Sequence, residues 1–164
     1  LLRVAETLKT TPAELFGRAE AAMREIRELH QTVEKMKDRL FAGEVDQFLF
    51  SAKSIGGLKV LTANRGAADA ADLRRMGDFL RDKNSGIVAV LSAINGEKVT
   101  LLAVCGKDAI AKGVKAGDII RTIAPIVDGK GGGKPDSAMG GGSEVLKVDD
   151  ALAAVDDYVA SKVQ

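Results

Sequence analysis

The sequence predicts a protein of mixed α+β and α/β class, in which a heptad-patterned helical arm precedes a small α/β domain with a mixed sheet. Three observations lead to this prediction. Apolar residues first recur every three or four positions, a Gly-Gly pair then ends that repeat, and short apolar runs alternate with helical ones afterwards. We place the helical arm at residues 1–53 and the α/β domain at residues 56–164.

Composition excludes several classes of protein. With 46% apolar and 29% charged residues, the 164-residue chain has the make-up of a globular protein. The single cysteine, Cys105, rules out an internal disulfide, and no apolar run reaches the roughly 18 residues of a membrane span. We therefore expect a cytoplasmic protein without membrane partners. Because the first residue is Leu1 rather than Met, we expect a fragment of a longer protein.

Capping residues predict where the main helix of the arm begins. Residues 1–8 are typical of the end of a helix, and Thr11-Pro12-Ala13-Glu14 then forms a start signal. A threonine suits the cap, a proline suits the first helical position, and a glutamate three residues after the cap completes a capping box. We therefore expect a new helix at this segment.

The main helix carries an apolar seam at alternating spacings of four and three residues, which is the a/d pattern of a coiled coil. So narrow a stripe packs against one or two helices. It therefore predicts either an antiparallel hairpin within the arm or self-association of two chains. We expect Gly43 to interrupt the helix and residues 44–53 to form a shorter one. The seam residues are Leu15, Ala19, Ala22, Ile26, Leu29, Val33, Met36 and Leu40.

Alternation between the two periodicities predicts the elements of the α/β domain in order. We expect parallel strands over residues 58–63 and 87–93, joined by a helix over residues 67–83, as in a right-handed βαβ unit. Asn95-Gly96 is a type I′ turn signal, and it leads to an antiparallel strand over residues 99–105.

Helices dominate the remainder of the predicted domain. We expect helices over residues 108–115 and 118–127, with Pro125 kinking the second or ending it early. Residues 144–148 are expected to form a short strand, and Asp149 is expected to cap a last amphipathic helix.

Glycine is concentrated in one segment, Gly129–Gly142, where it occupies seven of fourteen positions. Each glycine costs about 0.5–1 kcal/mol relative to alanine in regular structure, so the cluster requires sharp bends or close backbone contacts. It is either a tight loop whose second triplet packs on a neighbouring element, or a nest of backbone N–H groups that faces phosphate. A P-loop is excluded because Gly133-Lys134 is followed by Pro135.

Basic residues surround the glycine segment. Between Lys107 and Lys134 six basic residues stand against three acidic ones, a local excess of about +3. This is either a solvated surface or an RNA-binding one, and folded RNA is recognised largely through shape and phosphates. His30 is the only histidine, and we expect no catalytic residue and no metal ligand. The RNA-binding candidates are Lys107, Lys112, Lys115, Arg121, Lys130, Gly131, Gly132, Gly133, Lys134, Gly140, Gly141 and Gly142.

The glycine-proline segment behind a heptad-bearing arm resembles the C-terminal region of alanyl-tRNA synthetases. The globular part is similar to the DHHA1 domain, which that family shares with the DHH phosphoesterases. Lys134 stands where the family commonly has arginine. The residues that carry the resemblance are Gly131, Gly132, Gly133, Lys134, Pro135, Asp136, Ala138, Gly141 and Gly142, together with the entry segment 56–61.

The resemblance implies a non-catalytic, tRNA-binding fragment of a ligase that serves protein biosynthesis. The parent protein would join alanine to tRNA with ATP and would carry zinc, whereas this fragment would hold no cofactor. Its expected partners are alanine-specific tRNA, the upstream catalytic and editing domains, whose activities it would help to couple, and a second copy bound through the arm. Two alternatives stay open: a purely structural or oligomerisation module, and a substrate-binding accessory domain of a DHH-type phosphoesterase.

Overall fold

The computed structural model describes residues 2–164, so the part of the predicted first helix at Leu1 lies outside the described residues. The chain divides into two compact units, Leu1–Ala42 and Gly43–Gln164. This boundary precedes the one placed at residues 53–56, because the end of the long helix packs with the second unit. Across residues 2–164, no helix combines the length and the apolar character needed to cross a lipid bilayer.

The first unit contains a short helix, α1 (Leu2–Thr7), and most of the long helix α2 (Leu15–Ser51). The predicted start signal forms a turn directly before α2, in which the Glu14 N–H donates to the Thr11 carbonyl at 3.1 Å. The Thr11 hydroxyl donates to the Glu14 carboxylate at 2.9 Å, so this side-chain pair replaces the reciprocal backbone bonds of a capping box.

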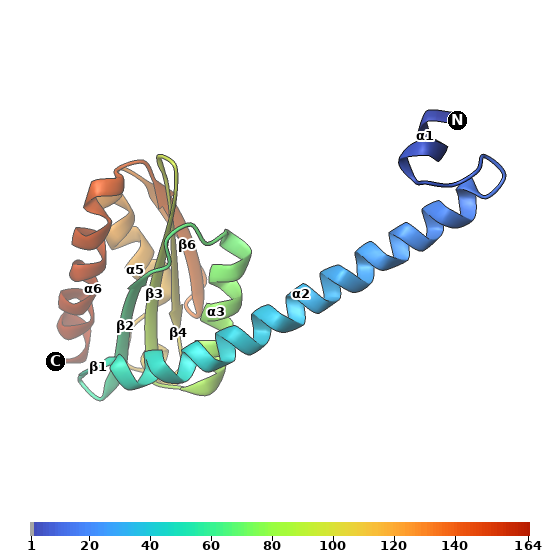
Figure 1. Ribbon diagram of the computed structural model, residues 1–164. Coiled ribbons are helices and arrows are strands. Elements are labelled where there is room, and N and C mark those ends of the chain that lie inside the picture. The colour runs from blue at the N-terminus through green and yellow to red at the C-terminus, as the bar shows by residue number, and fades with distance from the viewer. Residues whose placement is uncertain (1) are drawn as a thin grey trace. The chain divides into compact units, whose positions relative to one another are not determined.

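The predicted break at Gly43 is wrong, because α2 continues without interruption to Ser51 (Figure 1). A helical glycine costs only about 1 kcal/mol relative to alanine, and the residues that follow it are held by the second unit. Val45 is fully buried, and the Glu44 carboxylate pairs with the Arg65 guanidinium at 2.6 Å. Packing therefore outweighs the weak helix propensity of one residue.

The heptad seam remains largely exposed. Five of its residues are 46–67% exposed, and residues 2–42 contain no second long helix that could pair with α2. The described residues of the first unit therefore do not form the antiparallel hairpin that was one of the two interpretations. The exposed members of the seam are Ile26, Leu29, Val33, Met36 and Leu40.

The second unit is built on one mixed sheet, which confirms the predicted fold class. Within residues 43–164 the strand order is β1-β2-β3-β4-β6-β5. β2 and β3 are parallel and the other neighbours are antiparallel, so the predicted βαβ unit and the returning strand are both present. The strands are β1 (Lys53–Ile55), β2 (Leu58–Asn64), β3 (Ile87–Asn95), β4 (Lys98–Cys105), β5 (Lys130–Gly133) and β6 (Ser137–Gly142).

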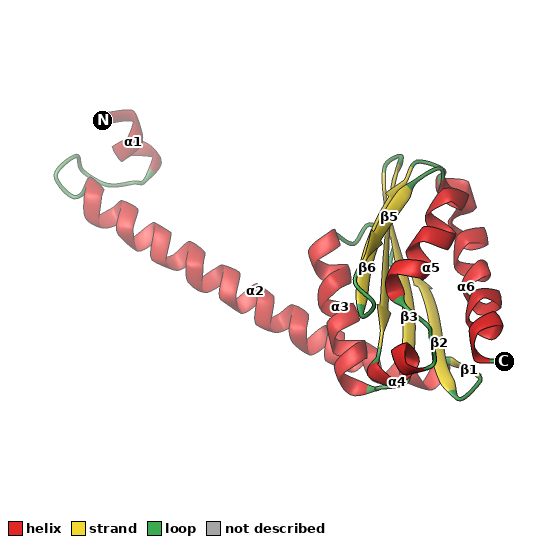
Figure 2. Cartoon of the chain, turned by 180° about the vertical axis from the view of Figure 1, so that it is seen from behind, coloured by secondary structure: helices red, strands yellow, loops and turns green. Residues whose placement is uncertain are grey.

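Helices cover both faces of this sheet (Figures 1 and 2). On one face, α3 (Ala70–Lys83) lies so close to β4 that a Cβ at Gly77 would be 2.8 Å from Leu102. On the other face lie α5 (Ala116–Ile123), the 3-10 helix η1 (Ala124–Val127) and α6 (Val148–Val163). Ile119, Ile120 and Ile123 of α5 are fully buried between these layers.

Two turns differ in detail from the sequence prediction. Pro125 does end a helix early, because α5 stops at Ile123 and the proline is the second residue of the 3-10 helix η1 that follows. Between β3 and β4 the turn residues are Gly96 and Glu97, since Asn95 pairs with Lys98. Of these two only Gly96 has a positive φ, +62°, which is the pattern of a type II′ turn rather than type I′.

The elements before and after the glycine segment also differ from those predicted from the sequence. The helix predicted over residues 108–115 is shorter, α4 (Lys107–Ala111). The prediction of a strand over residues 144–148 is wrong. The backbone N–H groups of residues 143 and 144 both donate to the Val127 carbonyl, at 2.9 and 3.0 Å, so the chain turns away from the sheet. The 3-10 helix η2 (Val145–Lys147) follows, and Asp149 lies in the first turn of α6 rather than at its cap.

Candidate functional site

The glycine segment forms the β5–β6 hairpin at one edge of the sheet, not an open loop. Gly131 pairs with Gly140 and Gly133 with Ala138. The Lys134 N–H donates to the Ser137 carbonyl at 3.0 Å, which closes a turn over Pro135 and Asp136. The prediction of a loop with a nest of free N–H groups is therefore wrong, since most of these groups bond within the sheet.

Close packing explains most of the glycines. A Cβ at Gly131 or Gly140 would lie 2.6 or 2.8 Å from the Cγ2 atom of Ile120, so α5 rests directly on the backbone of the hairpin. A Cβ at Gly142 would lie 2.1 Å from the Val127 carbonyl oxygen of η1. No side chain fits at such distances. The second glycine triplet therefore packs against neighbouring elements, as expected if the glycines serve close packing.

Gly132 is the exception among these glycines. A Cβ there would meet only the Nε atom of Arg121, at 3.8 Å, which is ordinary van der Waals contact. β5 is also the last strand of the sheet, so one side of its backbone is unpaired. Since Lys134 bonds to β6, the alternation of an antiparallel ladder directs the N–H group of Gly131 toward the open edge, whereas the same side of Gly133 lies against Gly117 of α5.

The six basic candidates fall into two groups. The Lys112 ammonium donates to the Gly56 carbonyl at 2.7 Å, and the Arg121 guanidinium forms an ion pair with Asp118 one helical turn earlier. The remaining four are exposed and form no side-chain hydrogen bond or ion pair with any of residues 2–164. These four are Lys107, Lys115, Lys130 and Lys134.

Three of the four unpaired lysines lie around the turn between β5 and β6. Lys115 immediately precedes Ala116, whose N–H donates to the Pro135 carbonyl at 2.8 Å, so Lys115 and Lys134 flank one hydrogen bond. Lys107 lines a cavity of about 450 Å³ together with Asp136 of the turn. We call Lys107, Lys115 and the turn residues 134–137 the turn surface.

The turn surface is held rigidly by backbone contacts. Besides the bond to Ala116, the Cys105 N–H at the end of β4 donates to the Asp136 carbonyl at 3.0 Å. A Cβ at Gly117 would lie 2.7 Å from the Gly133 carbonyl oxygen, so the first turn of α5 sits directly on this corner. Lys130 is at the other end of β5, about 13 Å away along an extended strand, and is separate from the turn surface.

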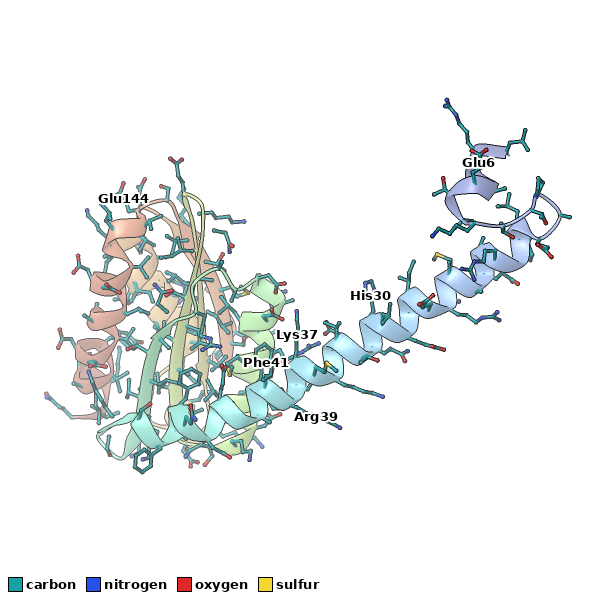
Figure 3. All side chains as sticks on the ribbon, in the orientation of Figure 1. Glu6, His30, Lys37, Arg39, Phe41 and Glu144 are labelled. Carbon is teal, nitrogen blue, oxygen red and sulfur yellow. The ribbon has the colours of Figure 1, made fainter. Side chains whose placement is uncertain are left out.

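The single histidine and the single cysteine have very different surroundings. His30 extends from α2 into open surroundings (Figure 3) and is exposed. Burial, and secondarily the Asp136 carboxylate, raises the pKa of the Cys105 thiol to about 12, so it stays protonated at neutral pH. Among residues 2–164, no three histidine, cysteine, aspartate or glutamate side chains gather as a metal site would require.

One side chain at the turn surface was missed by sequence reasoning. Arg81 of α3 donates from Nη1 to the Asp136 carboxylate at 3.1 Å and from Nη2 to the Asp78 carboxylate at 3.0 Å. It also lines the cavity beside Lys107. No local signal could have found it, because Arg81 and Asp136 are 55 residues apart in the sequence.

Comparison with curated proteins identifies relatives along the whole chain. It is 40% identical over 163 residues to the alanine–tRNA ligase of Cupriavidus necator, covering 99% of this chain and 18% of the relative. It is 38% identical over 164 residues to that of Acetivibrio thermocellus, covering 99% of this chain and 19% of the relative. The chain thus spans about a fifth of the length of the curated relatives that it matches.

Solved structures show the same fold. The C-Ala domain of Aquifex aeolicus alanyl-tRNA synthetase superposes with a TM-score of 0.63 at 24% identity, over 67% of this chain and 98% of that one. RecJ of Thermus thermophilus, solved in complex with Mg²⁺, superposes with a TM-score of 0.56 at 17% identity, over 96% of this chain and 28% of that one. Residues 57–161 match the model of the DHHA1 domain. Since this match takes in strands β2 to β6, α3, α5 and the glycine hairpin, the chain belongs to the DHHA1 domain family.

Proposed function

We propose that this chain is the C-terminal part of an alanine–tRNA ligase and binds tRNA through the turn surface. The observation that carries the proposal is the grouping of Lys107, Lys115 and Lys134, all exposed and unpaired, around a turn fixed by backbone hydrogen bonds. A fixed corner with three available ammonium groups suits the phosphate backbone of a folded RNA, which has a definite shape. The N–H group of Gly131, farther along the same edge of β5, adds a neutral donor for a phosphate oxygen.

The salt dependence of the affinity follows from the number of phosphates that the lysines neutralise. Three such contacts give a slope of about −2.7 in a plot of log K against log salt concentration, because each contributes roughly −0.9 on duplex-like RNA. The affinity then falls about 40-fold between 50 and 200 mM salt. The formal net charge of the whole chain is only +1, so this salt dependence has to come from a local surface.

The test compares two double variants with the same change in charge. Lys115→Glu with Lys134→Glu alters the turn surface, whereas Lys98→Glu with Lys147→Glu alters two exposed, unpaired lysines elsewhere. Lys98 begins β4, about 24 Å along the strand from its Cys105 end. We expect the first variant to lose most of its affinity for an alanine-specific tRNA transcript in fluorescence anisotropy. The second should retain most of it, with both circular dichroism spectra unchanged. Equal losses in the two variants would show that net charge alone governs binding.

The relatives support a proposal for the wider role of the chain. We infer that the parent protein joins alanine to tRNA with ATP, and that the domains carrying this activity, its zinc and its editing lie outside this chain. By holding the tRNA, the fragment would help to couple aminoacylation with editing. Because the matched relatives are alanine–tRNA ligases, this role has more support than a phosphoesterase accessory role.

A structural role for the arm is the second candidate, and the exposed seam of α2 favours it. In heptad terms Ile26 and Val33 are at a positions and Leu29 is at a d position, a combination that favours two-stranded coiled coils. Sedimentation equilibrium would then report a dimer, and Leu29→Lys would convert it to a monomer. A dimer that shows no tRNA binding at low salt would favour the structural role over the RNA-binding one.

A further inference from the structure

We propose that Arg81 and Asp136 form a positioning pair, which fixes the turn between β5 and β6 so that Lys134 faces the bound RNA. This inference rests on the proposed function, since it concerns the same surface. Neither residue is assigned a contact with RNA, and both act through Lys134.

The geometry of Arg81 sets it apart from an ordinary surface arginine. Its side chain is only 28% exposed, and one guanidinium bonds two carboxylates at once. The bond to Asp78 lies within α3, three residues away. The bond to Asp136 joins α3 to the turn across 55 residues of sequence. Because a guanidinium is planar and carries several donors, it can bond two carboxylates independently.

The Arg81–Asp136 ion pair anchors a side of the turn that the backbone hydrogen bonds do not reach. Backbone bonds from Cys105 and Ala116 reach the carbonyl groups of Asp136 and Pro135, and they anchor the main chain on the side of β4 and α5. Among the contacts of residues 134–136 with the rest of the second unit, the Arg81 bond is the side-chain link that reaches across to α3. Lys134 itself has no intramolecular side-chain partner within residues 2–164, so the turn backbone determines where its ammonium group is presented.

Charge and positioning predict opposite results for one substitution. Asp136→Asn removes a negative charge within the turn surface, so simple electrostatics predicts tighter binding of tRNA. If the carboxylate instead holds the turn for Lys134, its loss weakens binding. Asp78→Asn is the matched control, because it neutralises the other carboxylate on the same guanidinium and leaves the link to the turn in place.

The experiment measures tRNA affinity against salt for the 164-residue chain and four variants: Asp136→Asn, Asp78→Asn, Arg81→Met and Arg81→Lys. Losing one phosphate contact lowers the salt slope by nearly one, which corresponds to about five- to eightfold weaker binding at 0.1 M salt. We expect this loss for Asp136→Asn and Arg81→Met, partial recovery in Arg81→Lys, and unchanged or slightly tighter binding for Asp78→Asn. In a Lys134→Met background, Asp136→Asn should no longer weaken binding, because its effect passes through that lysine.

Amide hydrogen exchange supplies a readout that needs no RNA. The Lys134 and Ala116 amides should exchange faster in Asp136→Asn than in Asp78→Asn. Equal exchange in these two variants, or binding by Asp136→Asn as tight as that of the unmodified chain, would refute the positioning pair and leave the proposed function standing. If the unmodified chain fails to bind tRNA at low salt, the proposed function falls and the positioning role falls with it.

Discussion

Adjacent glycines of β5 should respond in opposite ways to the same substitution. At Gly131 a Cβ would approach Gly140 Cα at 2.4 Å, Ile120 Cγ2 at 2.6 Å and the Met139 carbonyl oxygen at 2.6 Å. Two of these atoms belong to the backbone of the paired strand, and the third is on a fully buried isoleucine, so none can yield cheaply. At Gly132 the space is open except for Arg121 Nε at 3.8 Å.

The magnitudes follow from these contacts. Overpacking of a filled site costs typically 1–3 kcal/mol, and three contacts below 3.0 Å place Gly131→Ala toward the upper end, at about 2–3 kcal/mol. Gly132→Ala meets no such contact, and the restricted unfolded chain should stabilise the variant by about 0.4–1 kcal/mol. For a chain of this length each kcal/mol moves the Tm by roughly 2–4 °C, so the two melting temperatures should differ by about 5–15 °C.

The assay can be confined to the second unit. Tyr158 in α6 is the only tyrosine, and the chain has no tryptophan, so tyrosine fluorescence reports the unfolding of the unit that contains the hairpin. The two variants are melted side by side with the unmodified chain. Equal melting temperatures, or a lower one for Gly132→Ala, would contradict the argument that α5 rests on the backbone at Gly131 and leaves Gly132 free.

Two further predictions concern the core and a helix cap. Cys105 should react with a thiol reagent only on unfolding. Because burial raises its pKa from 9.0 to about 12, its contribution to stability is complete below pH 9 and is lost as the pH rises toward 12, which titration of the unfolding free energy would detect. Asp69→Ala removes the carboxylate that accepts from the Asp72 N–H at 2.7 Å at the start of α3. It should lower the unfolding free energy by about 1 kcal/mol in a urea titration, whereas Asp69→Ser should lose much less.

Strands of the buried sheet were predictable because their sequence carries the signal itself. Residues 87–93 and 99–105 are runs of apolar, partly β-branched residues, and each forms a strand within two residues of the expected bounds. The glycine hairpin carried no such signal. Glycine has a low strand propensity, and β6 becomes a strand because β4 offers it a partner and α5 requires bare backbone there. Both of these elements lie more than ten residues away in the sequence.

The candidate site was predictable in composition but not in arrangement. Counting charges found the basic excess around the glycine segment, yet counting could not show that Lys112 is engaged with the Gly56 carbonyl. Nor could it show that Lys130 stands apart from Lys115 and Lys134. These distinctions depend on contacts between segments that are distant in the sequence. The Arg81–Asp136 bond is itself such a contact, so no sequence pattern indicated it.

The open edge at β5 has a consequence for solubility as well as for binding. An unpaired strand edge invites the addition of a strand from another molecule, which is a common route to aggregation. Here the edge is only four residues long, and it is bracketed by Lys130 and Lys134, which repel the same edge of a second molecule. We therefore expect the two lysines to disfavour pairing of this edge with the same edge of another copy, while the glycine backbone between them stays exposed.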